Sequence, residues 1–150
     1  REGTILMDRY EELEKTFKVN TIGPVYICSR FFDLLAESGG GTVINISSEV
    51  VSIDGVGPKY AAYCMSKTAI AQYGFILKQT AAALGIPTRV FSVHPGRMKT
   101  AMGAENGQIE AAESAEGIYR LAVGEVLADN REIYVDYRGN AMLHQTGRKE

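Results

Sequence analysis

The sequence GTVINISS, residues 41–48, decides the fold class that we expect for this chain of 150 residues. Its core is a short run of β-branched residues that follows several glycines and leads into a loop, so we predict a buried strand over Thr42–Ser47. A similar run predicts a second buried strand over Thr88–Val93. The residues between the two strands have the length and apolar content of a helix. Strands that alternate with such helices form βαβ units, so the pattern predicts an α/β domain with a parallel sheet.

Helices make up most of the remaining predicted layout. Apolar or small residues recur in steps of three and four from Asp8 to Leu35, which is the period of a helix, and the later half is apolar on more than one side. Gly23 and Pro24 should bend this helix or break its hydrogen-bond ladder, because proline has no backbone N–H. The other predicted elements are two helices and a weak third strand, over Tyr60–Leu84, Ala112–Val123 and Glu132–Val135.

The composition is that of an ordinary globular domain. Apolar residues make up 45% of the chain, charged residues 23%, and the formal net charge is −2. The chain has no excess of basic residues, which argues against a nucleic-acid partner. It also has no run of about 18 apolar residues, so no membrane span is predicted. Cys28 and Cys64 lie among apolar residues of predicted helices, so we expect two reduced core thiols in a cytoplasmic protein. His94 and His144 are isolated, and no Cys/His cluster has metal-ligand spacing.

Three residues in the middle of the chain can form a proton-transfer site. Tyr63 and Lys67 are four positions apart in the helix predicted over Tyr60–Leu84, so they lie on one helix face. A free phenol titrates near pH ~10, and a lysine cation one turn away would favour its ionised form. Ser48 lies just past the first predicted strand, at the edge where ligands bind in such sheets, and would add a hydroxyl that can hydrogen-bond a substrate oxygen.

The order and surroundings of these residues resemble the short-chain dehydrogenase/reductase family. The resemblance spans Asn20 to Thr100, where GTVINISS at 41–48 is followed by YCMSK at 63–67, RVFSVHPG at 89–96 and RMKT at 97–100. A weaker likeness continues through SAEG at 114–117 and YVDYRGN at 134–140. The resemblance implies a doubly wound, Rossmann-like parallel sheet. It also implies an NAD(P)-dependent oxidoreductase that interconverts a carbonyl and an alcohol on a small-molecule substrate.

The same resemblance implies a role for each residue of the site. Tyr63 would be the general acid/base, Lys67 would bind the nicotinamide ribose and support the tyrosine, and Ser48 would orient the substrate carbonyl. Ser47 is the alternative to Ser48, and the sequence leaves that choice open. Asn20 matches the family's fourth active-site residue, which sits at a helix irregularity and holds a proton-relay water. An asparagine competes for backbone groups inside a helix, which fits such a geometry.

The segment after the second predicted strand would contact the cofactor. Pro95, Gly96, Met98 and Thr100 match the family's segment beside the nicotinamide. There the backbone near Met98 and the hydroxyl of Thr100 would meet the carboxamide or the phosphates. A Pro-Gly pair after a strand is also an ordinary turn, which is the alternative for those two residues. We expect His94 to pack or hydrogen-bond at the strand end rather than to act as a base.

The sequence also lacks one part of a dinucleotide site. No Gly-rich turn joins a strand to a helix, so the chain offers no cradle for a pyrophosphate. Residue 1 is not Met, and the chain opens almost directly into a helix. We therefore expect residues 1–150 to be the C-terminal, catalytic part of a single Rossmann-like domain, with the N-terminal dinucleotide-binding strands before Arg1. The residue that separates NAD from NADP would lie there too, so the expected cofactor is NAD or NADP.

Two further expectations concern assembly. A helix that packs only on its own sheet needs one apolar stripe, and the two long predicted helices have a surplus of apolar residues. We therefore expect a homo-oligomer that pairs through these helices, as members of the family commonly do. The alternative function is that of a truncated, non-catalytic relative that acts as an assembly or binding module.

Overall fold

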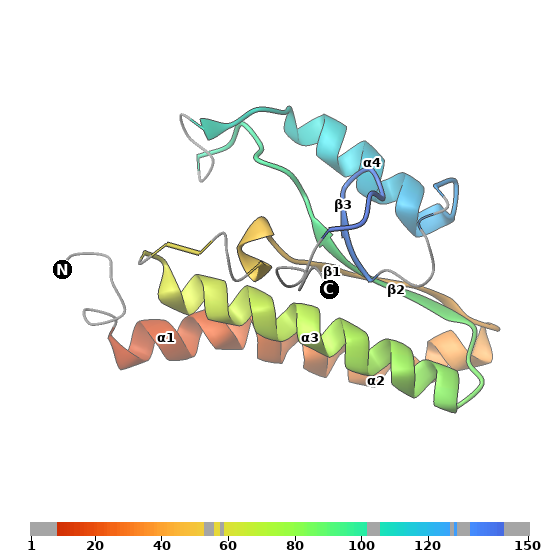
Figure 1. Ribbon diagram of the computed structural model, residues 1–150. Coiled ribbons are helices and arrows are strands. Elements are labelled where there is room, and N and C mark those ends of the chain that lie inside the picture. Colours follow the sequence, from red (N-terminus) through yellow and green to blue (C-terminus); the bar gives the residue numbers. More distant parts are fainter. Residues whose placement is uncertain are drawn as a thin grey trace, which may run out of the picture.

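The computed structural model describes residues 9–52, 56–57, 59–101, 106–126, 128 and 133–142 of the chain. Figure 1 shows these residues as a small sheet with helices packed on it. The elements in chain order are α1 (Tyr10–Phe17), the π-helical turn η2 (Lys18–Ile22), α2 (Gly23–Glu37), β1 (Gly41–Ile46), the 3₁₀ turn η3 (Glu49–Val51), α3 (Ala61–Ala83), β2 (Thr88–His94), α4 (Ala111–Val123) and β3 (Tyr134–Asp136).

The three strands form one parallel sheet in the order β1-β2-β3. The last pairs in register are Ile46 with Val93 and His94 with Asp136. α1, α2 and α3 lie on one face of the sheet and α4 lies on the other (Figure 1). Parallel strands require crossover connections, and here these are helical and cover both faces. The predicted α/β class, with a doubly wound parallel sheet, is confirmed.

The first long helix is continuous but changes its hydrogen-bond pattern in the middle. In η2 the backbone N–H of Gly23 donates to the carbonyl of Lys18, five residues earlier. Pro24 follows at the start of α2 and has no N–H with which to continue the regular ladder. The break that we predicted at Gly23 and Pro24 is confirmed, and it takes the form of a π turn that contains Asn20.

The helix boundaries differ from the predicted ones by a few residues. The helix predicted to end at Leu35 continues to Glu37, and its predicted start, Asp8, lies outside the described residues. α3 begins at Ala61 rather than at Tyr60, because Tyr60 has a left-handed backbone (φ 61°) that an α-helix cannot contain. These corrections leave Tyr63 and Lys67 inside the helix, as predicted.

The strand boundaries shift in the same small way. β1 gains Gly41 and excludes Ser47, although the Ser47 N–H still donates to the Val93 carbonyl at 2.8 Å. β3 covers Tyr134–Asp136 in place of the predicted Glu132–Val135, of which residue 132 lies outside the described part. The ends of an element are set by single hydrogen bonds, which the sequence pattern does not resolve.

The core lies on both faces of β2. The buried residues of α3 are Cys64, Ser66, Ile70, Ala71, Gly74, Leu77 and Ala81. At Gly74 the helix comes so close to β2 that a Cβ would lie 2.6 Å from the Oγ of Ser92. The buried cluster on the α4 side consists of Phe91, Val93, Leu121, Val135 and Tyr137. This packing fixes the amino-terminal half of α3, with Tyr63 and Lys67, relative to the strand ends.

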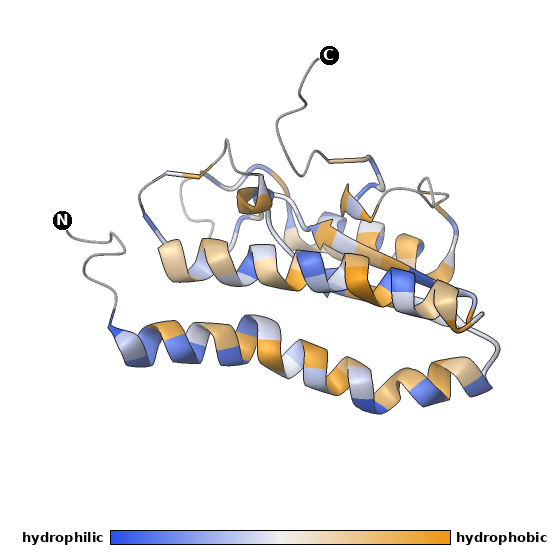
Figure 2. Ribbon diagram, turned by 60° about the horizontal axis from the view of Figure 1, so that its bottom comes forward, coloured by the Kyte–Doolittle hydropathy of each residue, from blue (hydrophilic) through white to orange (hydrophobic). Residues whose placement is uncertain are grey.

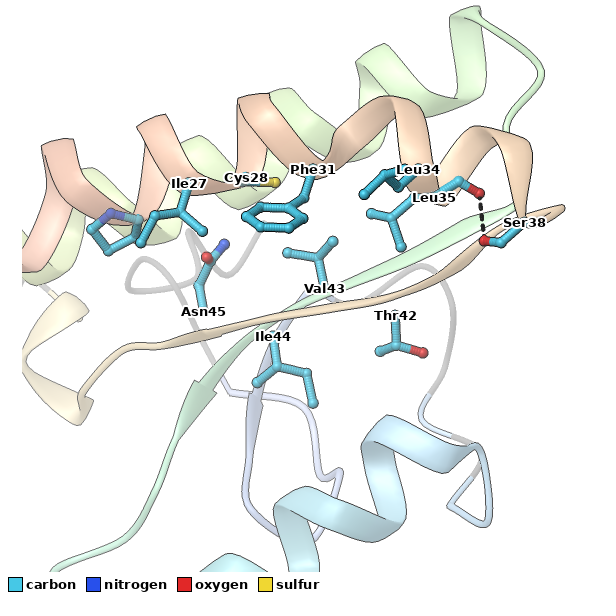
Figure 3. A pocket seen from close by; sticks show the side chains of 11 residues that line it. Ile27, Cys28, Phe31, Leu34, Leu35, Ser38, Thr42, Val43, Ile44 and Asn45 are labelled. Carbon is cyan, nitrogen blue, oxygen red and sulfur yellow. Dashed lines mark hydrogen bonds between the residues drawn. The ribbon is translucent and has the colours of Figure 1, made fainter.

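The outer edge of β1 is open along the described residues, where β1 pairs with β2 alone. A groove of about 660 Å³ lies between this edge and α2. Ile27, Phe31 and Leu34 of α2 point toward Val43 of β1 in this groove (Figure 3), and their side chains are exposed. Nδ2 of Asn45, another residue of the groove, is buried without a hydrogen-bond partner. This Nδ2 faces α3, where a Cβ at Gly74 would lie 3.5 Å from it. The edge itself presents an unpaired strand beside exposed apolar side chains, which is unusual for a finished sheet edge.

Three further features concern the described residues only. Cys28 is partly buried in α2 and Cys64 is buried in α3, and both are free thiols. None of the described helices is both long enough and apolar enough to cross a membrane. Within the same residues, no group of three or more His, Cys, Asp or Glu side chains is arranged to hold a metal ion.

Candidate active site

Two segments that follow neighbouring strands meet at one edge of the sheet. Ser47 and Ser48 follow β1, and Pro95–Thr100 follow β2. Because the two strands are parallel and in register, their carboxyl ends lie side by side. The hydrogen bond from the Ser47 N–H to the Val93 carbonyl extends this pairing one residue past β1. The candidate serines and the candidate cofactor segment are therefore neighbours.

Lys67 reaches from the second turn of α3 to the carboxyl end of β1. Its Nζ donates to the carbonyl of Ile46 (2.8 Å) and lies 5.8 Å from the centroid of the Tyr63 ring. Burial lowers the pKa of Lys67, because desolvation penalises the charged ammonium. The structure thus places Tyr63 and Lys67 together on α3, with the ammonium beside the strand that leads into Ser48.

The side chain of Asn20 is hydrogen-bonded to α3 at the helical turn between Tyr63 and Lys67. Its Nδ2 donates to the Oγ of Ser66 (3.0 Å), and the hydroxyl of Ser66 donates in turn to the carbonyl of Tyr63 (2.8 Å). The neighbouring Thr21 hydroxyl donates to the carbonyl of Ser66 (2.9 Å). The π turn is therefore held against the part of α3 that carries the tyrosine and the lysine. Ser66 was not among the residues singled out from the sequence.

A cavity of about 260 Å³ connects two of the four predicted catalytic residues. Asn20 and Lys67 both line it, together with Asn45 and Ile46 of β1. A space of this volume with amide and ammonium groups on its wall can hold water molecules. Ser48 and Tyr63 are not among its lining residues.

The two adjacent serines have different surroundings. The hydroxyl of Ser47 donates to the carbonyl of Lys67 (3.3 Å), and the residue is 1% exposed. Ser48 is 8% exposed, and its carbonyl accepts a hydrogen bond from the hydroxyl of Tyr134 (2.8 Å). Ser47 thus uses its side chain to connect β1 to α3, whereas Ser48 accepts the Tyr134 hydrogen bond with its backbone carbonyl.

The segment Pro95–Thr100 is held in place from two sides. The Pro95 carbonyl accepts a hydrogen bond from the Ser114 hydroxyl of α4 (2.6 Å). Gly96 has a φ of 82°, and a Cβ there would lie 2.5 Å from the side chain of Ile109, so only glycine fits this turn. Met98 forms an isolated β-bridge with Ile109, and the Thr100 N–H donates to the Met98 carbonyl (2.9 Å).

Glu49, His94 and Arg97 form a second set of contacts that sequence reasoning missed or underrated. Arg97 makes an ion pair with Glu49 (2.7 Å), and the Glu49 N–H donates to Nδ1 of His94 (3.1 Å). The sequence holds only a local signal for this pair, since opposite charges directly follow Ser48 and Gly96, shortly after the two predicted strands. The expectation that His94 hydrogen-bonds at the strand end is confirmed.

The burial of His94 makes the fold sensitive to acid. Burial lowers the pKa of His94 from its usual value of 6.5, and Arg97 acts in the same direction, while Glu49 and Asp136 oppose it. The unfolded chain therefore binds the His94 proton more tightly than the folded one. As a result, neutral His94 contributes to the free energy of unfolding. The contribution is complete above about pH 6.5, and it is lost as the pH falls through the lower pKa that His94 has in the folded protein.

We predict that His94→Asn reduces the dependence of stability on pH below about pH 6.5, because Oδ1 can accept the Glu49 N–H without titrating. The measurement is the free energy of unfolding in urea at several pH values for both proteins. Carboxylates titrate in both, so the difference between the two curves isolates His94. Parallel curves across this range would contradict the prediction.

Comparisons with known proteins agree with this geometry. The family model described as "short chain dehydrogenase" matches residues 2–111. A short-chain type dehydrogenase/reductase from Picea abies is 33% identical over 129 residues, which cover 83% of this chain and 46% of that protein. The carbonyl reductase Sniffer of D. melanogaster is 26% identical with a TM-score of 0.80, covering 92% of this chain and 59% of its own. An NADPH-bound carbonyl reductase from chicken fatty liver, 24% identical with a TM-score of 0.78, shares the fold over 95% of this chain and 61% of its own.

The chain spans about half the length of the curated relatives that it matches. It belongs to the short-chain dehydrogenase family.

Proposed function

We propose that the full-length protein is an NAD(P)-dependent oxidoreductase that interconverts a carbonyl and an alcohol on a small molecule. The observation that carries this proposal is the placement of Tyr63 beside the desolvated ammonium of Lys67, next to the strand end that leads into Ser48. Membership of the family supports it, as do the names of the Drosophila and chicken relatives, which are carbonyl reductases. The proposal covers NAD and NADP alike.

In this mechanism the hydroxyl of Tyr63 gives a proton to the substrate oxygen in reduction and takes it back in oxidation. The Ser48 hydroxyl holds that oxygen by a hydrogen bond. Ser48 is preferred to Ser47, because the hydroxyl of Ser47 is already used on the Lys67 carbonyl. A bound nicotinamide would supply or accept the hydride. The protein's share is to place the proton-bearing groups around the reacting carbon.

Lys67 and Asn20 are assigned supporting roles. The Lys67 ammonium would bind the ribose of the cofactor and stabilise negative charge on the Tyr63 oxygen. Asn20 lines the same cavity as Lys67, so water held there could pass protons between the ammonium and bulk solvent. The hydrogen bond from Asn20 to Ser66 keeps this wall of the cavity in register with α3.

The nicotinamide end of the cofactor is assigned to two neighbouring groups of residues. The Lys67 ammonium reaches the carboxyl end of β1, and the turn with Pro95, Gly96, Met98 and Thr100 follows the adjacent strand β2. There they could bind a ribose and a carboxamide. We further propose that the pyrophosphate is bound by strands that precede β1 in a longer chain and form one Rossmann-like domain with residues 1–150. The open β1 edge and its apolar groove support this.

We predict that Tyr63→Phe lowers kcat of the full-length protein by about 10²–10⁴-fold, the range typical of a general acid–base group. The ring is kept and only the proton-bearing oxygen is lost, so cofactor affinity should change little. Steady-state kinetics with a panel of ketones and aldehydes, and fluorescence titration of the cofactor, make the two measurements.

Lys67→Ala is the companion variant and should lower both cofactor affinity and rate, since Lys67 is assigned to both. Tyr119→Phe is the matched control, because that exposed tyrosine lies on α4, away from the site. A Tyr63→Phe enzyme with the wild-type rate would remove Tyr63 from the mechanism. A folded wild-type protein that reduces no carbonyl would favour the alternative, an assembly or binding module.

A second prediction concerns the 150-residue polypeptide by itself. Without strands beyond the β1 edge it should bind NAD(H) and NADP(H) far more weakly than the full-length protein and show no measurable reductase activity. Titration calorimetry on the purified polypeptide, with its mass confirmed first, tests this. Micromolar affinity for either dinucleotide would show that the phosphate site does not require further strands.

We also propose a cytoplasmic homo-oligomer that pairs through the two long helices. α2 is more apolar than α1 (Figure 2), and the side chains of Ile22, Tyr26 and Ile76 are 57%, 58% and 55% exposed. Such exposed apolar residues on neighbouring helices favour contact with a second subunit. The two free thiols fit a reducing compartment.

We expect Ile76→Glu to dissociate the oligomer of the full-length protein, because it places a charge in the apolar contact. Sedimentation velocity at micromolar concentration measures the assembly state. Val123→Glu is the control: it is also exposed, but it lies on α4, across the sheet from α3 (Figure 1). A monomeric wild-type protein under these conditions would refute the assembly proposal.

A further inference from the structure

The turn that follows Ser48 is bound to the segment after β2 by both its backbone and its side chain. The backbone N–H of Glu49 donates to Nδ1 of His94 (3.1 Å). The Glu49 carboxylate accepts two hydrogen bonds from Arg97, at 2.7 Å from Nε and 3.2 Å from Nη2. On the other side, the hydroxyl of Tyr134 holds the Ser48 carbonyl (2.8 Å). These contacts fix Glu49 and the peptide unit that joins it to the candidate catalytic serine.

The Glu49–Arg97 pair contributes orientation more than stability. Two parallel N–H···O bonds between a guanidinium and a carboxylate fix the relative angle of the groups as well as their distance. The two side chains are 51% and 39% exposed for Arg97 and Glu49, so solvent and salt screen their attraction. Losing this pair should therefore affect the geometry of the two loops more than the stability of the fold.

We propose that the Glu49–Arg97 pair is a latch that positions Ser48 and couples it to the cofactor-contacting segment Pro95–Thr100. The inference rests on the proposed function, in which Ser48 holds the substrate oxygen and that segment lies beside the nicotinamide. Arg97 lies between Gly96 and Met98, so any movement of the segment on cofactor binding moves the guanidinium. The ion pair passes this movement to Glu49, the residue after Ser48. Glu49 and Arg97 are positioning residues and have no assigned contact with the reacting atoms.

Charge reversal in the full-length protein tests the latch. Glu49→Arg and Arg97→Glu each place like charges together and should lower kcat about tenfold to a hundredfold, since a displacement of about 1 Å can cost that much. KM and the Tm should change little. The double reversal restores opposite charges and should recover most of kcat. High salt should lower kcat of the wild type toward that of the single variants, because it screens the pair.

The matched control is Glu125→Arg. Glu125 pairs with Arg120 at 3.4 Å, and both side chains are exposed. This pair lies at the carboxyl end of α4 and includes no residue of the turn after Ser48 or of Pro95–Thr100. Like charges at this second pair should leave kcat near the wild-type value.

Amide hydrogen exchange over Ser48–Ser52 gives a readout that needs no activity. Exchange should rise in each single reversal, return to the wild-type level in the double reversal and stay unchanged in Glu125→Arg. Single reversals with unchanged exchange and kcat, or a double reversal no better than the singles, would overturn the latch. If a single reversal fails to fold, the double reversal must still fold and turn over like the wild type. A wild type without reductase activity that shows this exchange pattern would overturn the proposed function and leave the coupling of the two segments standing.

Discussion

The in-register, parallel pairing of β1 with β2 is the constraint on which the rest of the structure depends. The pairing ends at Ile46 and Val93. The loops that follow the two strands therefore start beside each other at the carboxyl end of the sheet. Polar groups from distant parts of the sequence then become neighbours without any long side chain having to reach across the sheet. A register shift of one residue would turn Ser48 and the loop after β2 to the wrong faces, because side chains alternate along a strand.

Helix α3 adds the groups that the strand ends lack, and its position is set by contacts at both ends of the candidate site. The close approach at Gly74 brings the helix onto β2, and the Lys67 ammonium reaches the Ile46 carbonyl. Burial lowers the pKa of Lys67, because desolvation penalises the charged ammonium. This partly buried position beside Tyr63 is compatible with the role proposed for Lys67.

Much of this arrangement follows from local sequence signals, and the exceptions have a physical reason. The β-branched run before Ser48 and the Gly23-Pro24 pair act within a few residues, so the sequence predicts both the strand and the break in the first long helix. The bond from Asn20 to Ser66 and the ion pair of Glu49 with Arg97 join residues that are more than forty positions apart. Such contacts depend on how elements pack, which neither periodicity nor composition encodes. The catalytic or cofactor-binding roles stay predictions for every residue of the site, namely Asn20, Ser48, Tyr63, Lys67 and the segment Pro95–Thr100.

The open edge of β1 links the fold to the proposed chemistry. The candidate proton-transfer groups lie at the carboxyl end of the strand, while the groove lies along its outer side. An added strand would bury Ile27, Phe31 and Leu34 and offer backbone partners to the strand edge, at about 25 cal/mol per Å² of apolar surface removed from water. It would also place a new strand end next to Ser48, on the side away from Pro95–Thr100. In parallel α/β sheets a ligand binds across the carboxyl ends of neighbouring strands. The same addition that completes the core would therefore extend the site in the direction in which a dinucleotide leads away from its nicotinamide.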